Sequence, residues 1–543
     1  MTAIGQPMPR GSVTSPNVGP MSVGPASGAP AGVTPAGAPA RAERLETLGV
    51  IARLFERLEA EGISYCHWKS NEHLGPSLLA LTDLDVLVDR AAAVPLAALL
   101  ASLGFKRFAA LPGRGYAGIE DYVGFDRETG RLAHLHLHWQ LTLGEAYLKG
   151  YRFPWERAML SARVWDGASR VYVADPHLEL LLLLVRSAMK LRVRDRLLLA
   201  PAARYLRGGQ LCELRWLADR AEPSRLVQVA TPLVGARAAR LLPDMLRPGG
   251  PTVRDLRALR RLADPAWRTY RTYDAPEAHV RRWLRELPAR ARALTARVSR
   301  SSVRPSPRVL PHGGLLVALV GPDGAGKSTV SREIARWLSR EMTVVAIYGG
   351  SGSGRISWAR AAAEWLHRRL RVARRGSAGG SVAAPEVVAE PHGPRALARA
   401  GWALLLAAER LRTVTRARRA RDLGRAVIAD RFPQTQFPGI NDGPRLAHWV
   451  DAPSALLARA ARSERATYAT MERTSPDLVV KLTLPAEVAL QRKPDTPPAQ
   501  LRRKLEIVRL LRYPPATRVV EVDATLPLEQ VLLRVKRAVW EAV

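Results

Sequence analysis

The second half of the chain alternates short apolar runs with helical patterns. "LLVALV" (315–320) is an unbroken apolar run that ends at a glycine, as expected for a strand buried on both faces of a parallel sheet. After a glycine-rich loop, Val330, Ile334 and Leu338 recur at the spacing of one helix face. Further strand patterns follow in "RAVIADRF" (425–432), "PDLVVKLTLPAEVALQRKPD" (476–495) and "TRVVEVDAT" (517–525). The pattern therefore predicts an α/β fold with a parallel sheet flanked by helices.

The first half shows a different mixture of the same elements. From residue 42 to residue 233, helical patterns frame short strands, which predicts a first α/β domain. One of these strands is "DLDVLV" (83–88), where alternation places two aspartates on one face. Residues 237–300 have mostly helical patterns and include the basic amphipathic stretch "VRRWLRELPARARALTARVSR" (280–300). A helical extension therefore follows the first domain.

Length and composition divide the chain further. At 543 residues the chain exceeds the size of one hydrophobic core, so we expect two or three domains. Residues 1–41 are rich in Gly, Pro and Ala with almost no charge, and we expect them to be disordered. We predict the first α/β domain over residues 42–235, the basic helical segment and a Pro/Ser/Arg linker over 236–312, and the second α/β domain over 313–543. Within the latter, residues 374–396 form a low-complexity insertion with the character of a mobile loop.

The formal net charge of +34 is compatible with several partners. Residues 236–312 are the densest part, with 18 Arg against six Asp plus Glu. A solvated helical face and a weak contact with an anionic surface both explain such a segment. Specific binding of nucleic acid is the least favoured explanation, because no RNA-binding signature or zinc-finger pattern accompanies the charge.

Cysteine content and hydropathy bear on the compartment. The two cysteines, Cys66 and Cys212, provide no disulfide framework and suit a reducing environment. The N-terminus lacks a basic region followed by an apolar one, and the longest apolar runs, 180–185 and 402–408, are too short to span a bilayer. We therefore expect a cytoplasmic protein.

The loop after the predicted strand at 315–320 has the spacing of a phosphate-binding loop. "GPDGAGKS" (321–328) satisfies G-x-x-x-x-G-K-[ST] between a predicted strand and a predicted helix. Glycines let backbone N–H groups turn toward a phosphate, Lys327 neutralises the outer phosphates, and Ser328 offers a hydroxyl to Mg²⁺. An ordinary glycine-rich turn is the alternative, but strand, spacing, Lys-Ser pair and helix all agree with the phosphate loop. The predicted ATP-binding residues are Gly321, Gly324, Gly326, Lys327, Ser328 and Thr329.

Two further groups would complete a phosphoryl-transfer site. Asp430 and Arg431 end a short buried strand and so emerge at the carboxyl edge of the sheet, where such folds bind ligands. Asp430 can hold Mg²⁺ through water, and the planar guanidinium of Arg431 can bridge two phosphates. An exposed salt bridge at a strand end is the alternative.

Basic residues near the end of the chain are candidates for a flap over the nucleotide. Arg492 and Lys493 end a predicted helix and would neutralise the transferring phosphoryl group after closure. A second basic cluster follows at Arg502, Arg503 and Lys504. For Arg502 and Arg503 a solvated helix face is an equally good explanation.

Residues 313–543 resemble the thymidylate kinase family of P-loop nucleoside monophosphate kinases. The resemblance rests on G-P-D-G-A-G-K-S-T, D-R-F at 430–432, P-D-L…L-P-A-E-V-A-L-Q-R-K and a late V-D-A. It implies that Asp323 faces the acceptor's sugar, that Arg431 binds the acceptor's phosphate and that the catalytic arginine comes from the lid. After D-R-F this chain reads "PQTQFPGINDGPRL" in place of the family's usual thymine-seating residues. The resemblance therefore leaves the acceptor base open.

Residues 46–207 resemble a poorly characterised branch of the nucleotidyltransferase superfamily, through W-K-S-N followed by T-D-L-D. Asp83 and Asp85 lie on one strand face, close enough to share a divalent metal. The superfamily normally adds a third acid from a neighbouring strand, where this chain has "AHLHLHWQL" (133–141) with His136 at the expected place. His134, His136 and His138 share one face, and an H-x-H pair can chelate a metal, although a structural or acceptor-binding role is the simpler explanation. The missing acid indicates either weakened nucleotidyl transfer or a retained binding pocket.

Together these features predict an ATP- and Mg²⁺-dependent phosphotransferase joined to a nucleotidyltransferase-like domain. The expected partners are ATP and a small phosphorylated acceptor, most simply a nucleotide, and a homodimer is left open. Two alternatives remain. One is a regulatory or scaffold protein with slow ATPase activity, and the other is a nucleotidyltransferase acting through the first half.

Overall fold

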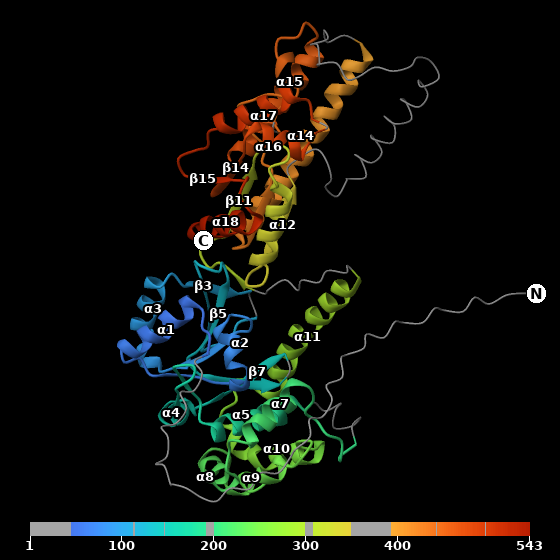
Figure 1. Ribbon diagram of the computed structural model, residues 1–543. Helices are drawn as coiled ribbons and strands as arrows, with labels where there is room; N and C mark the ends of the chain where they lie inside the picture. The colour runs from blue at the N-terminus through green and yellow to red at the C-terminus, as the bar shows by residue number, and fades with distance from the viewer. Residues whose placement is uncertain are drawn as a thin grey trace, which may run out of the picture. The chain divides into compact units, whose positions relative to one another are not determined.

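The computed structural model describes residues 45–111, 114–145, 147–191, 200–298, 308–348, 393–440, 442–494 and 496–543. The N-terminal stretch expected to be disordered lies outside these residues, as does nearly all of the predicted insertion at 374–396. The chain has a mixed α/β fold, which confirms the predicted class. Figure 1 shows the course of the described elements.

The rear half, residues 313–543, contains a five-stranded parallel sheet in the order β12-β13-β11-β14-β15. Its central strands are short apolar runs whose residues are almost all buried, as the sequence pattern predicted. The chain leaves β11 toward one side of the sheet and later returns on the other side, so the end of β11 lies at a topological switch point. The strands are β11 (Leu315–Val320), β12 (Val344–Tyr348), β13 (Ala426–Asp430), β14 (Leu478–Thr483) and β15 (Arg518–Asp523).

Helices cover both faces of this sheet because its side chains alternate in direction. Val317 and Leu319 pack in one core with residues of α12 and α18, whereas Leu316 and Ala318 pack in another with residues of α14 and α15. Figure 1 shows α12, α14 and α18 running along the sheet. The helices are α12 (Lys327–Leu338), α14 (Pro394–Asp422), η4 (Ala447–Trp449), α15 (Ala455–Glu472), α16 (Ala486–Arg492), α17 (Pro498–Leu510) and α18 (Leu528–Ala542).

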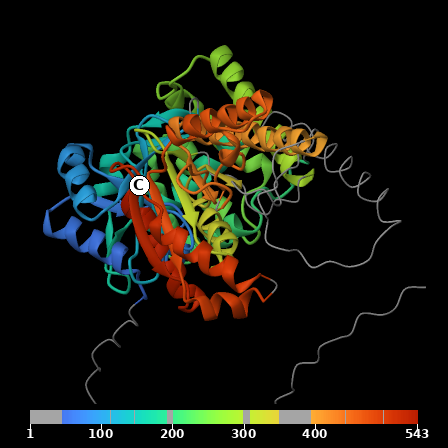
Figure 2. The same cartoon turned by 90° about the horizontal axis from the view of Figure 1, so that it is seen from above.

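The part of the chain before residue 313, called the front half below, contains a mixed sheet in the order β10-β3-β4-β5-β2-β1-β9-β8. Leu84, Val86 and Val88 of one strand share a core with helices α1 and α3, and Figure 2 shows these two blue helices side by side. The strands are β1 (Tyr65–His67), β2 (Leu84–Val88), β3 (Lys106–Ala110), β4 (Ile119–Phe125), β5 (Leu132–His138), β8 (Val164–Asp166), β9 (Val171–Val173) and β10 (Arg308–Val309). The helices beside them are α1 (Gly49–Ala60), η1 (Asn71–His73), α2 (Leu74–Leu78), η2 (Arg90–Ala92), α3 (Ala93–Ser102) and α4 (Glu156–Ser161).

A helical layer and a hairpin complete the front half. The hairpin strands β6 (Leu141–Glu145) and β7 (Leu148–Phe153) share one core with α5, whose run Leu180–Val185 is fully buried. The predicted helical character of residues 237–300 is confirmed over the described part of this range. The helices are α5 (Pro176–Lys190), α7 (Gly209–Ala218), α8 (Pro223–Val234), α9 (Ala236–Ala239), η3 (Pro243–Leu246), α10 (Val253–Arg268) and α11 (Ala275–Val298).

Two details concern the predicted connections. The expected linker at 301–312 contains the strand β10, which pairs antiparallel with β3 and therefore belongs to the front sheet. The last residues of the expected insertion at 374–396 are helical, because α14 begins at Pro394. Among the described helices, none combines the length and the apolar character needed to cross a membrane.

Candidate functional site

The phosphate-loop sequence folds as the strand–loop–helix unit that its spacing predicted. β11 ends at Val320 and α12 begins at Lys327. Gly324 and Gly326 have φ angles of 87° and 81°, in the left-handed region that favours glycine. A Cβ atom on Gly321 would lie 2.8 Å from the Leu482 carbonyl oxygen. These positions therefore need glycine for the backbone to follow the loop.

Lys327 and Ser328 lie at the first turn of α12, beside the end of β13. Lys327 is buried and its Nζ donates to the Pro322 carbonyl oxygen at 2.7 Å, and burial together with the charge of Arg431 lowers its pKa to about 8. Ser328 Oγ donates to Asp430 Oδ2 at 2.5 Å. The second oxygen, Asp430 Oδ1, is buried without a hydrogen-bond partner among the described residues.

That unpartnered oxygen is a test of whether the site suits a divalent cation. Buried carboxylate oxygens normally have partners, and a hard cation such as Mg²⁺ takes oxygen ligands from carboxylates, hydroxyls and water. Ser328 and Asp430 supply a hydroxyl and a carboxylate in contact with each other. The residues present therefore fit Mg²⁺. Thr329 lies exposed in the same first turn.

Asp323, in the middle of the loop, lies between two cations. Arg431 donates to Asp323 Oδ1 at 3.0 Å, and Lys504 Nζ lies 2.7 Å from Asp323 Oδ2. Burial opposes ionisation, but the hydrogen bond and charge of Lys504 outweigh it and lower the pKa of Asp323 to about 2. Arg431 has a φ angle of 73°, which is uncommon for a non-glycine residue and directs its side chain across the strand end.

The structure adds three residues that the sequence analysis did not single out. Asp442 is a buried carboxylate that pairs with Arg410 at 3.0 Å and lies 3.8 Å from Arg431. Arg410 also donates to the Tyr468 hydroxyl. Asp442 belongs to the "NDGP" stretch, where the sequence departs from the thymidylate kinase pattern. The signal in the sequence that could have identified Asp442 is an acidic residue in the loop that follows the Asp430–Arg431 pair.

Helices α16 and α17 lie over the loop. Arg492 Nη1 donates to the Ala524 carbonyl oxygen at 3.0 Å, and both Arg492 and Lys493 lie against Gly324. In α17, Arg502 and Arg503 are exposed, which agrees with the solvated-face explanation, whereas Lys504 reaches Asp323. The cavity at the loop measures only about 20 Å³, and Val508 and Leu511 of this region line it. The cavity beside Lys327 is therefore much smaller than a nucleotide.

In the front half, Asp85 is a buried carboxylate surrounded by donors. It is the register partner of His136 on the neighbouring parallel strand β5, and His136 is the residue that the sequence places where the superfamily has its third acid. Asp85 Oδ1 lies 2.8 Å from His136 Nδ1, 3.1 Å from His138 Nε2 and 3.0 Å from Lys69 Nζ. Burial opposes ionisation of Asp85, but its bonds to the histidines outweigh this effect and lower its pKa.

Asp83 lies on the same strand face but has a separate partner. It is mostly exposed and accepts a hydrogen bond at 2.8 Å from His134, which also contacts Asp121 of β4 at 2.8 Å. Burial lowers the pKa of His134, but the bonds to Asp121 and Asp83 outweigh it and raise the value to about 9. Asp121 is an acid from a neighbouring strand that the sequence analysis missed. Its strand is opposite β5, so only the strand pairing reveals it.

Among the described residues of the front half, one group of side chains is arranged so that it could hold a metal ion. The ligand atoms of Asp85, His136 and His138 all lie within 4.8 Å of one another. Burial lowers the pKa of His138 to about 3, so this imidazole is neutral, as a metal ligand must be. Two imidazoles and one carboxylate suit zinc or another transition metal better than Mg²⁺. This set differs from the Asp83–Asp85 pair expected from the sequence.

The W-K-S-N segment holds an unusual backbone conformation at this cluster. Lys69 and Ser70 have φ angles of 72° and 62°. Behind them, Asn71 donates from its backbone N–H and side-chain amide to the two oxygens of Glu179, at 3.0 and 2.6 Å. The buried Asn71–Glu179 contact therefore stabilises the turn that delivers Lys69 to Asp85.

Comparison with protein-family models gives no match for this chain. Two distant relatives come from Escherichia coli K12. The "uncharacterized ATP-binding protein YghR" is 27% identical over 253 residues, which are 46% of this chain and 94% of YghR. The "uncharacterized ATP-binding protein YghS" is 30% identical over 121 residues, which are 22% of this chain and 50% of YghS. The names of both relatives state ATP binding and no reaction.

Proposed function

We propose that this protein is an ATP- and Mg²⁺-dependent phosphotransferase, whose rear half transfers a phosphoryl group from ATP to a small phosphorylated acceptor. One observation carries the proposal: Lys327, Ser328 and Asp430 converge at the start of α12, where Asp430 keeps a buried oxygen without a partner among the described residues. The names of the two E. coli relatives support ATP as the nucleotide. The resemblance to thymidylate kinases supports the reaction class.

The donor side follows from the loop. Backbone N–H groups at the start of α12, with the positive end of the helix, would hold the phosphates of ATP. Lys327 would exchange the Pro322 carbonyl for the outer phosphates, and Ser328 and Asp430 would hold the metal ion, Asp430 through water. When bound, Mg²⁺ neutralises phosphate charge and aligns the transferring group.

On the acceptor side, Arg431 would bind the acceptor's phosphate and Asp323 would face its sugar. The support is that Arg431 already spans from β13 to Asp323 and that Asp323 is ionised at neutral pH. A planar guanidinium can bind a phosphate through two hydrogen bonds. The segment after Phe432 differs from the thymine-seating pattern, so we propose an acceptor other than thymidine monophosphate.

Closure of α16 and α17 would complete the site. Arg492 or Lys493, which lie against Gly324, would neutralise charge in the transition state. Lys504 would release Asp323 when the acceptor enters. The cavity at the loop measures about 20 Å³, far below the several hundred Å³ of a ligand pocket, so we propose that α16 and α17 move when a nucleotide binds.

For the front half we propose a binding role in place of full nucleotidyl transfer. Asp85, which a transferase would use for catalytic metal, is already satisfied by Lys69, His136 and His138. The free thiols Cys66 and Cys212 suit the reducing cytoplasm, where we propose that the protein acts.

The test is an assay of the purified protein with ATP and Mg²⁺ against nucleoside monophosphates, nucleosides and sugar phosphates, with ADP and pyrophosphate both measured. We expect ADP release that depends on one class of acceptor. Slow ATPase activity that no acceptor accelerates would support the regulatory or scaffold alternative. Pyrophosphate release would support the nucleotidyltransferase alternative.

A further inference from the structure

A large pocket lies in the front half, separate from both sites described above. Its volume is about 880 Å³, within the range of small-molecule sites. It is bordered by the carboxyl end of β2, the residues after β5, helix α4 and the segment that follows α10. None of the aspartates and histidines of the Asp85 cluster lines it. The pocket therefore needs an explanation of its own.

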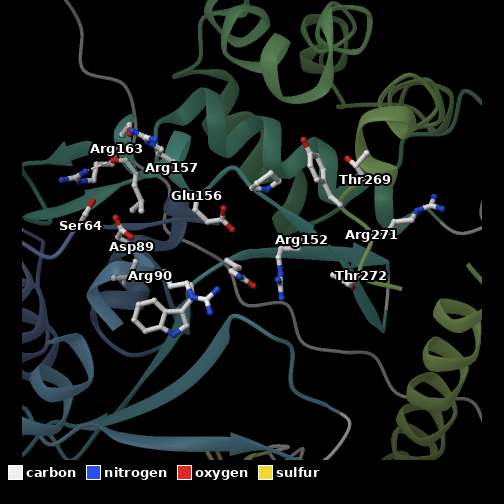
Figure 3. A pocket seen from close by; sticks show the side chains of 17 residues that line it. Ser64, Asp89, Arg90, Arg152, Glu156, Arg157, Arg163, Thr269, Arg271 and Thr272 are labelled. Atoms are coloured by element: carbon white, nitrogen blue, oxygen red, sulfur yellow. Dashed lines mark hydrogen bonds between the residues drawn. The ribbon is translucent and has the colours of Figure 1, made fainter. Parts of the chain in front are cut away.

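Arginines dominate its lining. Five of the 17 lining residues are arginines, whereas Lys and Arg together make up 83 of the 543 residues of the chain. Three of them, Arg152, Arg157 and Arg163, lie within twelve residues across β7, α4 and the residue before β8, and the pocket brings these together with Arg90 and Arg271 from distant parts of the chain. In Figure 3, Arg90, Arg152, Arg157 and Arg163 lie on the side of the pocket near Glu156, whereas the Arg271 side chain extends away from Glu156.

The two acidic residues of the lining do not neutralise these arginines. Glu156 accepts a hydrogen bond from the Leu141 backbone N–H at 2.9 Å, and Asp89 accepts one from the Ala91 N–H at 3.0 Å. Both carboxylates therefore serve the backbone of their own neighbourhood. Among the described residues, no ion pair joins a carboxylate to Arg90, Arg152 or Arg157. Arg271 pairs with Asp264 at 3.2 Å, and the lining keeps an excess of positive charge, with five arginines against two carboxylates.

Two arginines are held in place by contacts with aromatic residues. Arg163 lies over the Tyr172 ring at 4.6 Å and donates to the Leu160 carbonyl, yet its Nε is buried without a partner among the described residues. Arg271 donates to the Tyr151 hydroxyl at 3.1 Å. Because these contacts already engage Arg163 and Arg271, the arginines left to bind the anionic groups of a ligand are Arg90, Arg152 and Arg157.

The remaining lining suits the uncharged part of a ligand. Trp139 is half-buried and presents ring surface on which a planar group can stack. Hydroxyl and amide groups are also available, from Ser64, Gln140, Ser161, Thr269 and Thr272. We propose that this pocket binds a small molecule with a ring and two or more phosphate groups, with the phosphates on Arg90, Arg152 and Arg157 and the ring near Trp139.

Calorimetric titration with uridine diphosphate, pyrophosphate and uridine tests the proposal. The pocket variant is Arg90→Gln/Arg152→Gln/Arg157→Gln. The matched control, Arg237→Gln/Arg240→Gln/Arg254→Gln, removes the same charge from exposed positions of the same half, outside the pocket. Binding at the phosphate loop is common to both variants, so their difference reports on the pocket. Repeating the titrations with Lys327→Ala added removes much of the loop's contribution.

We expect uridine diphosphate to bind the wild type more tightly than pyrophosphate does, with no measurable binding of uridine. The dissociation constant should rise at least about tenfold in the pocket variant and stay within about twofold in the control. Equal losses in both variants, or no binding of either diphosphate by the wild type, would overturn the proposal. Pyrophosphate binding as tight as that of uridine diphosphate would overturn its ring component. If the triple variant fails to fold, Arg157→Gln alone, on an exposed part of α4, should still weaken binding about threefold, and unchanged binding would count against the pocket.

Discussion

The phosphate-loop site and the Asp85 cluster each place a lysine and a buried aspartate next to a strand end, but they differ in how the aspartate is satisfied. Asp430 has one hydrogen-bonded oxygen and one that lacks a partner among the described residues. Asp85 Oδ1 has three donors around it, from Lys69, His136 and His138. The first carboxylate can accept a cation without losing a contact. The second must give up at least one internal partner.

The comparison shows that residue type and strand position alone do not distinguish these two carboxylates. Sequence spacing marked Asp430 and Asp85 equally well, as aspartates in short buried strands. An unsatisfied buried carboxylate oxygen is destabilising, and a bound cation would compensate for it at Asp430. A satisfied cluster instead stabilises the fold or selects a different ligand. Variants of the two sites should therefore have different consequences.

Lys327→Ala should produce the largest effect. Removing the cation at the outer phosphates should reduce ATP turnover on the order of 10²–10³-fold, the usual cost of losing one group that stabilises developing charge. Coupled measurement of ADP release checks this, with circular dichroism to verify the fold. Arg503→Ala, on the exposed face of α17, is the control and should retain full turnover. Turnover of Lys327→Ala equal to that of the wild type would refute the kinase assignment.

The same substitution at the two aspartates provides the sharpest contrast. Asp430→Asn should lower ADP release roughly 10²-fold and raise the Mg²⁺ concentration required, because the residue can no longer hold the metal with a charged group. Asp85→Asn should leave ADP release within about twofold and abolish any pyrophosphate formation that the front half supports. Mg²⁺ titrations of both variants measure this. Equal losses of ADP release would mean that the two halves share one active site.

The sequence predicted a site well where its contacts follow from local spacing or from the shared edge of a parallel sheet, and poorly where they do not. The phosphate loop and its helix are local, so spacing was enough to predict them, and Ser328 and Asp430 meet because parallel strands end at the same sheet edge. Asp121 and Asp442 were missed although their partners lie only 13 and 32 residues away, because these contacts depend on strand pairing and on the course of a loop. Asp121 reaches His134 through antiparallel pairing of β4 with β5, and Asp442 meets Arg410 of α14. Neither contact leaves a spacing pattern.

A third prediction concerns Glu179, a buried carboxylate of the front half that acts on stability. Burial raises its pKa from 4.5 to about 7, with Glu213 adding to this effect and Asn71 and Arg186 opposing it. The folded state therefore holds the proton to higher pH than the unfolded state does. Protonated Glu179 therefore contributes at most roughly 3 kcal/mol to the free energy of unfolding. This contribution is fully present below pH 4.5 and is lost as the pH rises through 7. Urea unfolding followed by tryptophan fluorescence should show a shallower decline between pH 4.5 and 7.5 for Glu179→Gln than for the wild type. Parallel pH profiles would contradict the assignment.

The smallest expected effect concerns the acceptor. Arg431→Ala should raise the KM for the phosphorylated acceptor about tenfold, roughly 1.4 kcal/mol, with a smaller change in the KM for ATP, because Arg431 lies beside Asp323 on the acceptor side of the loop. Lys504→Ala should instead lower the KM for the acceptor, since the substitution frees Asp323 from its Lys504 partner. Steady-state kinetics with each substrate varied in turn separates the two constants.

Thymidine monophosphate should be a poor substrate, because Asp442 and its neighbours occupy the segment that seats thymine in the family that the rear half resembles. Phosphorylation of thymidine monophosphate at about 1–100 s⁻¹ would show that this segment still accepts the base. In that case the departure after Phe432 would concern the packing of Asp442 against Arg410 and Arg431, and the acceptor would be the family's own.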